Sequence, residues 1–291
     1  MAIYVDRNTK VVIQGLTGKQ GRYYGLRNRD YGTKVVAGTN PNKAGTDVDG
    51  IPIHATVAEV VSQTGANASF VIVPARFCKA AIYEAAEAGI PLIVCVTEHI
   101  PAHDQAEIYQ HLKQEHPGTR MIGPNCAGIL SPGQCNIGFT PAEVSRPGPV
   151  GVISRSGTLA YQALYELTEA GIGQSTCVGI GGDPVPGTSF VDALAAFVED
   201  NETRAIVLIG EIGGNAEEEA AEFIAQHVRK PVIAYIAGMT APPGVKMGHA
   251  GAIISGGKGT AAAKMETLEA AGVKIARNPT DIGPLVTSAL S

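Results

Sequence analysis

Short apolar runs alternate with helix-like segments along the whole chain, and this alternation restricts the fold more than any other feature of the sequence. Most of the runs end in glycine, proline or small polar residues, as strands of a parallel sheet do when crossover helices connect them. Both halves are therefore predicted to be α/β, each with a doubly wound parallel sheet. We expect strands at residues 11–14, 34–37, 69–73 and 92–96, near residue 121, and at residues 151–153, 176–179, 205–209, 232–235 and 273–276.

The chain length of 291 residues predicts about two domains. Between the two series of strands, the sequence contains GPNCAG, SPGQC and RPGP, which are rich in turn-forming residues and lack periodicity. We therefore predict a first domain at residues 1–123, a connection at 124–149 and a second domain at 150–291.

Charge and composition exclude several classes of partner. The net charge of -5 and pI near 5.8 provide no general attraction to nucleic acid or to an anionic membrane. No apolar run is long enough to span a bilayer, and the first residues resemble neither a signal peptide nor a presequence. Five cysteines without a CxxC pair argue against a disulfide framework or structural zinc. We expect a cytoplasmic protein; a mitochondrial protein whose presequence has been removed is the alternative.

The first expected strand leads into QGLTGKQG, in which Gly15, Gly18 and Gly21 precede a helix that should begin near Lys19. Such a turn exposes backbone N–H groups at the positive end of a helix, where a phosphate or pyrophosphate can bind. Leu16 stands where the dinucleotide fingerprint has a second close glycine, so the match to that fingerprint is incomplete. An ordinary tight turn is the alternative.

The end of the second strand distinguishes between nucleotide cofactors. A nicotinamide dinucleotide site would have Asp or Glu there for the ribose hydroxyls, but GTNPNKAG has Lys43 as its first charge. A lysine suits the additional ribose phosphate of coenzyme A, unless it is merely solvated. Val96, Thr97 and Glu98 follow the fourth strand and are expected to line the same crevice, although Glu98 could instead cap a helix.

In the second half, the strand ending at SRSGT leads directly into another helix. No acid occurs before Glu166, so the N–H groups at Ser156, Gly157 and Thr158 are predicted to bind an external phosphate. Tyr161 lies one turn into this helix and can direct its hydroxyl toward the same ligand, or pack as an ordinary aromatic side chain.

The segment MGHAGAIISGGKGT places His249 among five glycines with no acidic residue, which suits an imidazole that meets phosphate. The alternative is a histidine in a glycine-rich surface loop. Glu211, in GEIGG at a strand end, can accept a hydrogen bond from one imidazole nitrogen and leave the other as a nucleophile. Residues 217–219 are interpreted as a solvated helix start. Lys258 is followed by glycine and lacks a P-loop context, so we predict no complete nucleotide site here.

Taken together and in order, these motifs with VTE, GPNC and GIGGDPVPG resemble the family of succinyl-CoA synthetase (succinate–CoA ligase) α subunits from end to end. The resemblance implies a Rossmann-like CoA-binding domain followed by a flavodoxin-like ligase domain. It also implies reversible conversion of succinyl-CoA, phosphate and ADP or GDP to succinate, CoA and ATP or GTP through succinyl phosphate. A β subunit with an ATP-grasp site would bind the Mg-nucleotide, in an αβ or α2β2 assembly.

The resemblance also implies roles for single residues. His249 falls on the phosphohistidine, Glu211 on the glutamate that orients it, and Tyr161 on a tyrosine associated with the carboxylate substrate. The amino end of the helix after SRSGT would face the phosphohistidine, together with a helix from β. The coenzyme A contacts would be Thr17, Gly18, Lys19, Gln20, Lys43, Val96, Thr97 and Glu98, with the backbone of Lys19 mattering more than its side chain.

Two other functions remain open on the residues alone. One is a related acyl-CoA synthetase or citrate-cleaving enzyme that uses a different acid. The other is a non-catalytic module that binds CoA or NAD, with His249 in a structural role. A zinc enzyme ranks lower, because His249 has no nearby His or Cys at ligand spacing.

Overall fold

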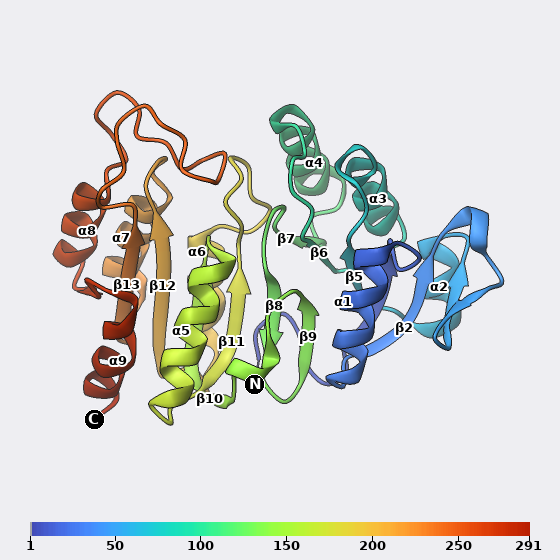
Figure 1. The fold of residues 1–291 in the computed structure, drawn as a ribbon, viewed down its shortest axis with the longest axis horizontal. Helices are drawn as coiled ribbons and strands as arrows, with labels where there is room; N and C mark the ends of the chain where they lie inside the picture. The colour runs from blue at the N-terminus through green and yellow to red at the C-terminus, as the bar shows by residue number, and fades with distance from the viewer. Residues whose placement is uncertain (1) are drawn as a thin grey trace.

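The computed structural model describes residues 2–291 and contains two sheets of seven strands each, both flanked by helices (Figure 1). The predicted α/β class with two doubly wound sheets is confirmed, and both sheets are mostly parallel. All ten expected strands are present, with ends that differ by a few residues from those expected. Within residues 2–291, no helix combines the length and apolar character needed to cross a membrane.

The first sheet has the strand order β3-β4-β2-β1-β5-β6-β7, in which only β3 is antiparallel to its neighbour. Without β3, this is the order of a dinucleotide-binding fold, which reverses direction between β1 and β5. The strands are β1 (Lys10–Gln14), β2 (Lys34–Thr39), β3 (Asp47–Val48), β4 (Ile51–His54), β5 (Ala68–Val71), β6 (Leu92–Cys95) and β7 (Arg120–Ile122).

Helices cover this sheet unequally. Three of them bury apolar side chains against one face, in a core with Val12, Val71 and Ile93. A single helix, α1, covers part of the other face, where Ile13 and Phe70 belong to a core that continues into the second half. The helices are α1 (Lys19–Asp30), α2 (Val57–Thr64), α3 (Ala75–Glu87) and α4 (Ala102–Glu115).

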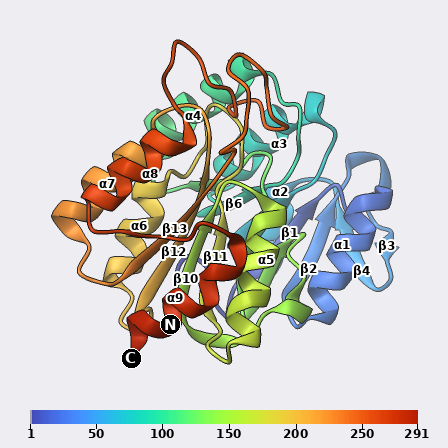
Figure 2. The ribbon, with the colours of Figure 1, turned by 60° about the vertical axis from the view of Figure 1, so that its left-hand side comes forward.

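The second sheet has the order β14-β13-β12-β10-β11-β8-β9. Its five parallel strands follow the flavodoxin-like order, which reverses between β10 and β12. Figure 2 shows α5 and α9 in front of these strands, with α7 and α8 to their left. The elements are β10 (Pro147–Ser154), α5 (Gly157–Glu169), β11 (Gln174–Gly179), α6 (Phe190–Glu199), β12 (Ala205–Glu211), α7 (Ala216–His227), β13 (Val232–Ala237), α8 (Ala261–Ala270), β14 (Lys274–Ile275) and α9 (Ile282–Leu290).

The segment at residues 124–149, expected as a connection, contains a hairpin of β8 (Gly128–Ser131) and β9 (Cys135–Gly138). β8 pairs antiparallel with β11 and contacts β6, while β9 packs against α1, so the hairpin joins the two halves. A Cβ atom on Gly138 would lie 2.7 Å from the Cα atom of Gly128, which explains the glycines at both ends. The strands escaped prediction because each is four residues long, without a continuous apolar run.

Open parallel sheets bind ligands where the strand order reverses, at the carboxyl ends of the strands. In the first sheet, the reversal lies beside Gln14 and Ile72, and in the second beside Arg155 and Ile209; a backbone hydrogen bond joins each pair. Residues 238–260 run between β13 and α8 without a helix or a named strand and carry His249. Figure 1 shows this segment in orange, looping above the carboxyl ends of the second sheet.

Candidate active site

The first point of strand reversal opens into a cavity of about 610 Å3. Its walls come from the turn after β1, the segment between β5 and α3, and the end of β6. The strands β1, β5 and β6 are neighbours in the first sheet. The lining residues are Gly18, Lys19, Gln20, Gly21, Tyr24, Ile72, Val73, Pro74, Ala75, Val96, Thr97, Glu98, His99 and Phe139.

Two helices begin at this cavity, and neither supplies an acid or a side-chain cap to its own first turn. α1 starts after Gly18 and α3 after Pro74. The first N–H groups of both helices therefore have no partner within the helix, and the positive ends of both helix dipoles meet the cavity. A Cβ atom on Gly21 would lie 2.0 Å from the carbonyl oxygen of Gly15, so only glycine allows α1 to begin this close to β1. The arrangement suits a phosphate-bearing ligand.

Six of the eight residues predicted to contact coenzyme A line this cavity: Gly18, Lys19, Gln20, Val96, Thr97 and Glu98. Thr17 faces a shallower depression on the other side of the turn, where its hydroxyl accepts a hydrogen bond from Asn40 Nδ2 at 2.8 Å. Lys43 ends the short helix η1 (Pro41–Lys43), is exposed and lies outside the cavity lining. The Asn40 contact nevertheless links its loop to the Thr17 turn.

At the second point of strand reversal, His249 and Glu211 meet as the sequence predicted. Nδ1 of His249 lies 2.7 Å from Oε2 of Glu211, which ends β12 and is buried. The contact raises the pKa of His249 above its ordinary value, chiefly through the hydrogen bond to Glu211. With Nδ1–H donated to the carboxylate, Nε2 of the neutral ring carries the free lone pair.

Backbone packing holds the imidazole against this carboxylate. A Cβ atom on Gly182 would lie 2.1 Å from Cγ of His249, so the ring occupies the space that any larger residue would fill. The N–H of Gly251 donates to the carbonyl of Gly182 at 3.2 Å, and the N–H of Met247 donates to that of Ala252 at 2.9 Å. These bonds close the turn that presents His249.

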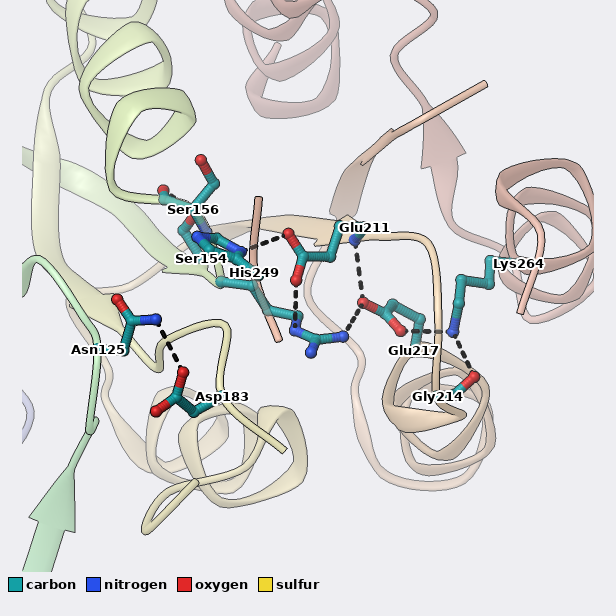
Figure 3. A network of polar contacts seen from close by, with 10 residues as sticks. Asn125, Ser154, Ser156, Asp183, Glu211, Gly214, Glu217, His249 and Lys264 are labelled. Carbon is teal, nitrogen blue, oxygen red and sulfur yellow. Dashed lines mark hydrogen bonds and ion pairs between the residues drawn. The ribbon is translucent and has the colours of Figure 1, made fainter. Parts of the chain in front are cut away.

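Behind Glu211, a series of buried charged side chains extends to α8, and Figure 3 shows it from close by. Oε1 of Glu211 lies 3.4 Å from Nε of Arg155, whose Nη1 lies 3.6 Å from Oε1 of Glu217. Oε2 of Glu217 lies 2.6 Å from Nζ of Lys264. The interpretation of Glu217 as a solvated residue was wrong, because its side chain is 0% exposed. Arg155, Glu217 and Lys264 were not predicted as site residues.

His249 also lines a second cavity, of about 200 Å3, together with Asn125, Asp183 and Lys246. Asp183 is buried and accepts hydrogen bonds from Asn125 Nδ2 and Gln105 Nε2, each at 2.8 Å. Burial raises the pKa of Asp183, while the bond from Asn125 acts in the opposite direction. The sequence contained Asp183 and Asn125 within GIGGDPVPG and GPNC, but no pattern indicated that they would meet.

The two cavities share Glu98 and His99 as lining residues. Both side chains are mostly exposed, and His99 has a backbone φ of 65°. A ligand that occupies the first cavity can therefore approach His249 past these two residues.

The amino end of α5 is linked to the carboxylate of Glu211 through Arg155, which immediately precedes Ser156. The hydroxyl of Ser156 accepts the N–H of Leu159 at 3.3 Å, so this helix caps itself in part. The N–H of Ser156 itself donates to Oγ of Ser154 at 3.1 Å. The prediction that the first N–H groups all require an external anion was therefore wrong for the amides of Ser156 and Leu159. The amides of Gly157 and Thr158 keep no partner within the helix. None of residues 156–158 lines either cavity.

Tyr161 is half-buried in α5 and packs against the core of the second sheet. Burial raises the pKa of Tyr161 to about 12, so its phenol stays protonated at neutral pH. A Cβ atom on Gly157 would lie 3.7 Å from the Tyr161 hydroxyl, which places that hydroxyl over the start of the helix. Tyr161 lines neither of the two cavities.

One group of described side chains away from these cavities has the spacing of metal ligands: His103, Asp104 and Glu107 on α4. Lys79 forms ion pairs with both carboxylates of this group, so a protein cation already offsets part of its negative charge.

Comparison with known proteins identifies relatives over the whole chain. Residues 6–99 match the family described as CoA binding domain, and residues 153–274 match the CoA-ligase family. The chain is 54% identical over 290 residues to succinate–CoA ligase [ADP-forming] subunit alpha 2 of Archaeoglobus fulgidus, covering 100% of each protein. It is 53% identical to the corresponding α subunit of Aquifex aeolicus over 100% of this chain and 95% of that protein.

Solved structures with low sequence identity share the fold. ATP citrate lyase of Methanosaeta concilii superposes with a TM-score of 0.87 at 23% identity, over 99% of this chain and 52% of that one. The dinucleotide-forming acetyl-coenzyme A synthetase 1 of Ca. Korarchaeum cryptofilum gives 0.76 at 22% identity, over 95% and 60%. The present chain thus spans about half the length of the structures it resembles.

Proposed function

This chain belongs to the family of succinate–CoA ligase α subunits, and we propose that it performs the phosphohistidine step of that ligase, with His249 as the phosphoryl carrier. The contact of 2.7 Å between His249 Nδ1 and Glu211 Oε2 carries the proposal. A ring held in this way is a nucleophile at Nε2 without any further proton transfer.

The reaction follows from this tautomer. Phosphate attacks the thioester of succinyl-CoA, which releases CoA and leaves succinyl phosphate. Nε2 of His249 then attacks the phosphorus atom, the N–P bond forms, and succinate departs as the P–O bond breaks. The ring keeps its proton on Nδ1 and becomes cationic, and the anionic Glu211 stabilises that charge. Transfer of the phosphoryl group to a nucleoside diphosphate restores the neutral ring.

Coenzyme A fits the first cavity. We assign its pyrophosphate to the start of α1, since Lys19, Gln20 and Gly21 offer free N–H groups there. Its thiol end would pass Glu98 and His99, which line both cavities, toward His249. Lys43 and Thr17 lie outside the cavity lining. Their proposed contacts with coenzyme A require either that the η1 loop moves or that part of the ligand extends beyond the cavity.

Phosphate, the succinate carboxylate and the nucleotide require groups outside the two cavities. We assign the phosphohistidine charge to the Gly157 and Thr158 amides and the succinate carboxylate to Tyr161. The relatives are named subunit alpha and ADP-forming; we propose a β partner that holds Mg-ADP on an ATP-grasp site. In this assignment, residues 1–123 form the CoA domain and 150–291 the ligase domain, with 124–149 between them.

The test is thioester formation by the chain purified with its coexpressed partner subunit. Succinate, CoA and Mg-ATP should give succinyl-CoA, with kcat/KM for succinate exceeding that for citrate or acetate. A higher value for citrate or acetate would reassign the acid while keeping the ligase chemistry. Thermal stabilisation by CoA without turnover would instead indicate a non-catalytic module. Stabilisation by NADH as strong as that by CoA would overturn the assignment of the first cavity.

A further inference from the structure

We propose that the buried Lys264–Glu217 ion pair is a positioning element that keeps Arg155 on Glu211, and so keeps Glu211 aligned with His249. The inference rests on the proposed function of His249, which it extends to two residues that touch neither cavity. Figure 3 shows the path from the ring of His249 to Lys264 on α8.

The burial of these side chains makes their charges interdependent. The side chains of Lys264 and Glu217 are both 0% exposed, and those of Arg155 and Glu211 are 9% and 8% exposed. Buried charges are tolerated only when they are paired and hydrogen-bonded. Lys264, Glu217, Arg155 and Glu211 alternate in sign and sum to zero, so none of the four is left without a counterion.

Arg155 stands between two carboxylates and cannot neutralise both. Its Nε lies 3.4 Å from Glu211, and its Nη1 lies 3.6 Å from Glu217. Neither contact is a tight ion pair, whereas Lys264 lies 2.6 Å from Glu217. Without the Lys264 charge, Glu217 would attract Arg155 and draw it away from Glu211. The lysine therefore acts on His249 through two intermediate side chains.

The backbone ties the same elements together. The N–H of Glu211 donates to Oε1 of Glu217 at 3.1 Å, and Nζ of Lys264 donates to the carbonyl of Gly214 at 3.1 Å. The N–H of Gly213 donates to the carbonyl of Gly259 at 2.8 Å, just before α8 begins. The exit of the loop that carries His249 is thus anchored to the segment that directly follows Glu211.

The chemistry requires this balance. The ring must donate Nδ1–H to an anion before and after phosphorylation, so a protonated Glu211 would lose its function. An overly strong negative field would also hold a second proton on the ring at Nε2 and block the nucleophile. Arg155 opposes that effect, because its charge lowers the pKa of His249 while Glu211 and Asp183 raise it. Glu98, His99 and Lys246 also line the cavity around the ring.

The experiment measures single-turnover labelling of the purified complex with γ-32P-ATP between pH 5.5 and 9. Lys264→Met leaves a negative charge on Glu217, and we expect labelling to slow about tenfold at neutral pH. The pH at which the labelling rate is half-maximal should rise, because the ring of His249 then holds its second proton more tightly. The double variant Glu217→Gln/Lys264→Met removes both charges, so rate and profile should return toward wild type.

Glu218→Gln is the matched control. Glu218 also lies close to Lys264, at 2.7 Å, but its side chain is 32% exposed and it has no ion pair with Arg155. Its replacement should leave the pH profile unchanged. Lys264→Arg should likewise keep the wild-type profile, since the charge is preserved.

A purely structural role gives a different pattern. If the pair merely anchored α8, Lys264→Met would slow labelling equally at every pH, and the double variant would be no faster; either result overturns the proposal. If Lys264→Met fails to fold, the double variant decides: labelling near the wild-type rate supports the proposal, and a tenfold loss with intact CoA binding contradicts it. Absence of label in the wild-type complex would instead refute the proposed function itself.

Discussion

The two sheets of this chain each reverse strand order once, and the two crevices are built from different materials. At the β1–β5 reversal, the crevice is formed mainly by backbone: two uncapped helix ends and Gly21 border a cavity of about 610 Å3. At the β10–β12 reversal, side chains fill the equivalent position with Arg155, Glu211 and the imidazole of His249.

The two crevices tolerate different substitutions. A site made of N–H groups depends on backbone path and is insensitive to most side chains, so it suits a ligand that brings its own negative charge. A site made of buried, mutually neutralising charges depends on every member, so it suits covalent chemistry that requires one fixed tautomer.

The largest effect is expected at Glu211. Glu211→Gln keeps the shape of the side chain but replaces the carboxylate that accepts Nδ1–H with an amide. The imidazole of His249 can then adopt the wrong tautomer. Loss of the orienting carboxylate in an analogous His–Asp pair costs about 10⁴ in kcat, and we expect a loss of at least about 10³. Quenched-flow labelling gives the rate, and the Kd for CoA should stay unchanged. Weaker CoA binding of similar size would mean that the two crevices are not separable.

A smaller effect is expected where backbone touches the histidine. Gly182→Ala places a methyl group 2.1 Å from Cγ of His249 and must displace the ring. Misplacement of this kind costs about 10²-fold in turnover, which steady-state kcat measures. Gly118→Ala is the matched control, since a Cβ atom there meets nothing within 4 Å. Equal activity of the two variants would show that the observed position of the ring is not the reactive one.

The backbone-built crevice should respond to glycine and not to lysine. Gly21→Ala drives a methyl group toward the Gly15 carbonyl, 2.0 Å away, and should weaken CoA binding about tenfold by shifting the α1 amides. Lys19→Ala should change the Kd by less than about threefold, as a solvated side chain would. Isothermal titration with CoA measures both. A larger loss for Lys19→Ala would show that side-chain charge, and not the helix end, holds the ligand.

The smallest expected effect is a pH dependence of stability. Because the pKa of His249 is raised above 6.5 by Glu211, the folded state binds its proton more tightly than the unfolded state. The stabilisation from this pair is therefore complete below pH 6.5 and declines as the pH rises through the folded-state pKa. The free energy of unfolding in urea should differ more between wild type and Glu211→Gln at pH 6 than at pH 8.5. A pH-independent difference would contradict the predicted protonation of the ring.

The sequence was a good guide where the physical signal is local. Continuous apolar runs marked the parallel strands because both faces of each sheet are covered, and glycines marked the α1 turn because only glycine fits there. The β8–β9 hairpin was missed because its strands are short and are stabilised by β11 and α1, which are distant in sequence.

The candidate site divides in the same way. The sequence predicted that His249 and Glu211 would meet, since both lie in glycine-rich segments at the predicted ligand edge. It did not predict Lys264 and Glu217, which are 47 residues apart and belong to types that are seldom fully buried. The acid run at residues 217–219 looks like a solvated helix start, and only packing against α8 buries its first member.

The location of the phosphoryl group tests the proposed role of His249 most directly. The complex is incubated with Mg-ATP and quenched in alkali, and the chain is then analysed by 31P NMR and peptide mass spectrometry. We expect one base-stable, acid-labile phosphoryl group on Nε2 of His249, which is discharged by succinate and CoA and is absent from His249→Asn. Label on Nδ1, label on another residue, or undiminished labelling of His249→Asn would contradict it.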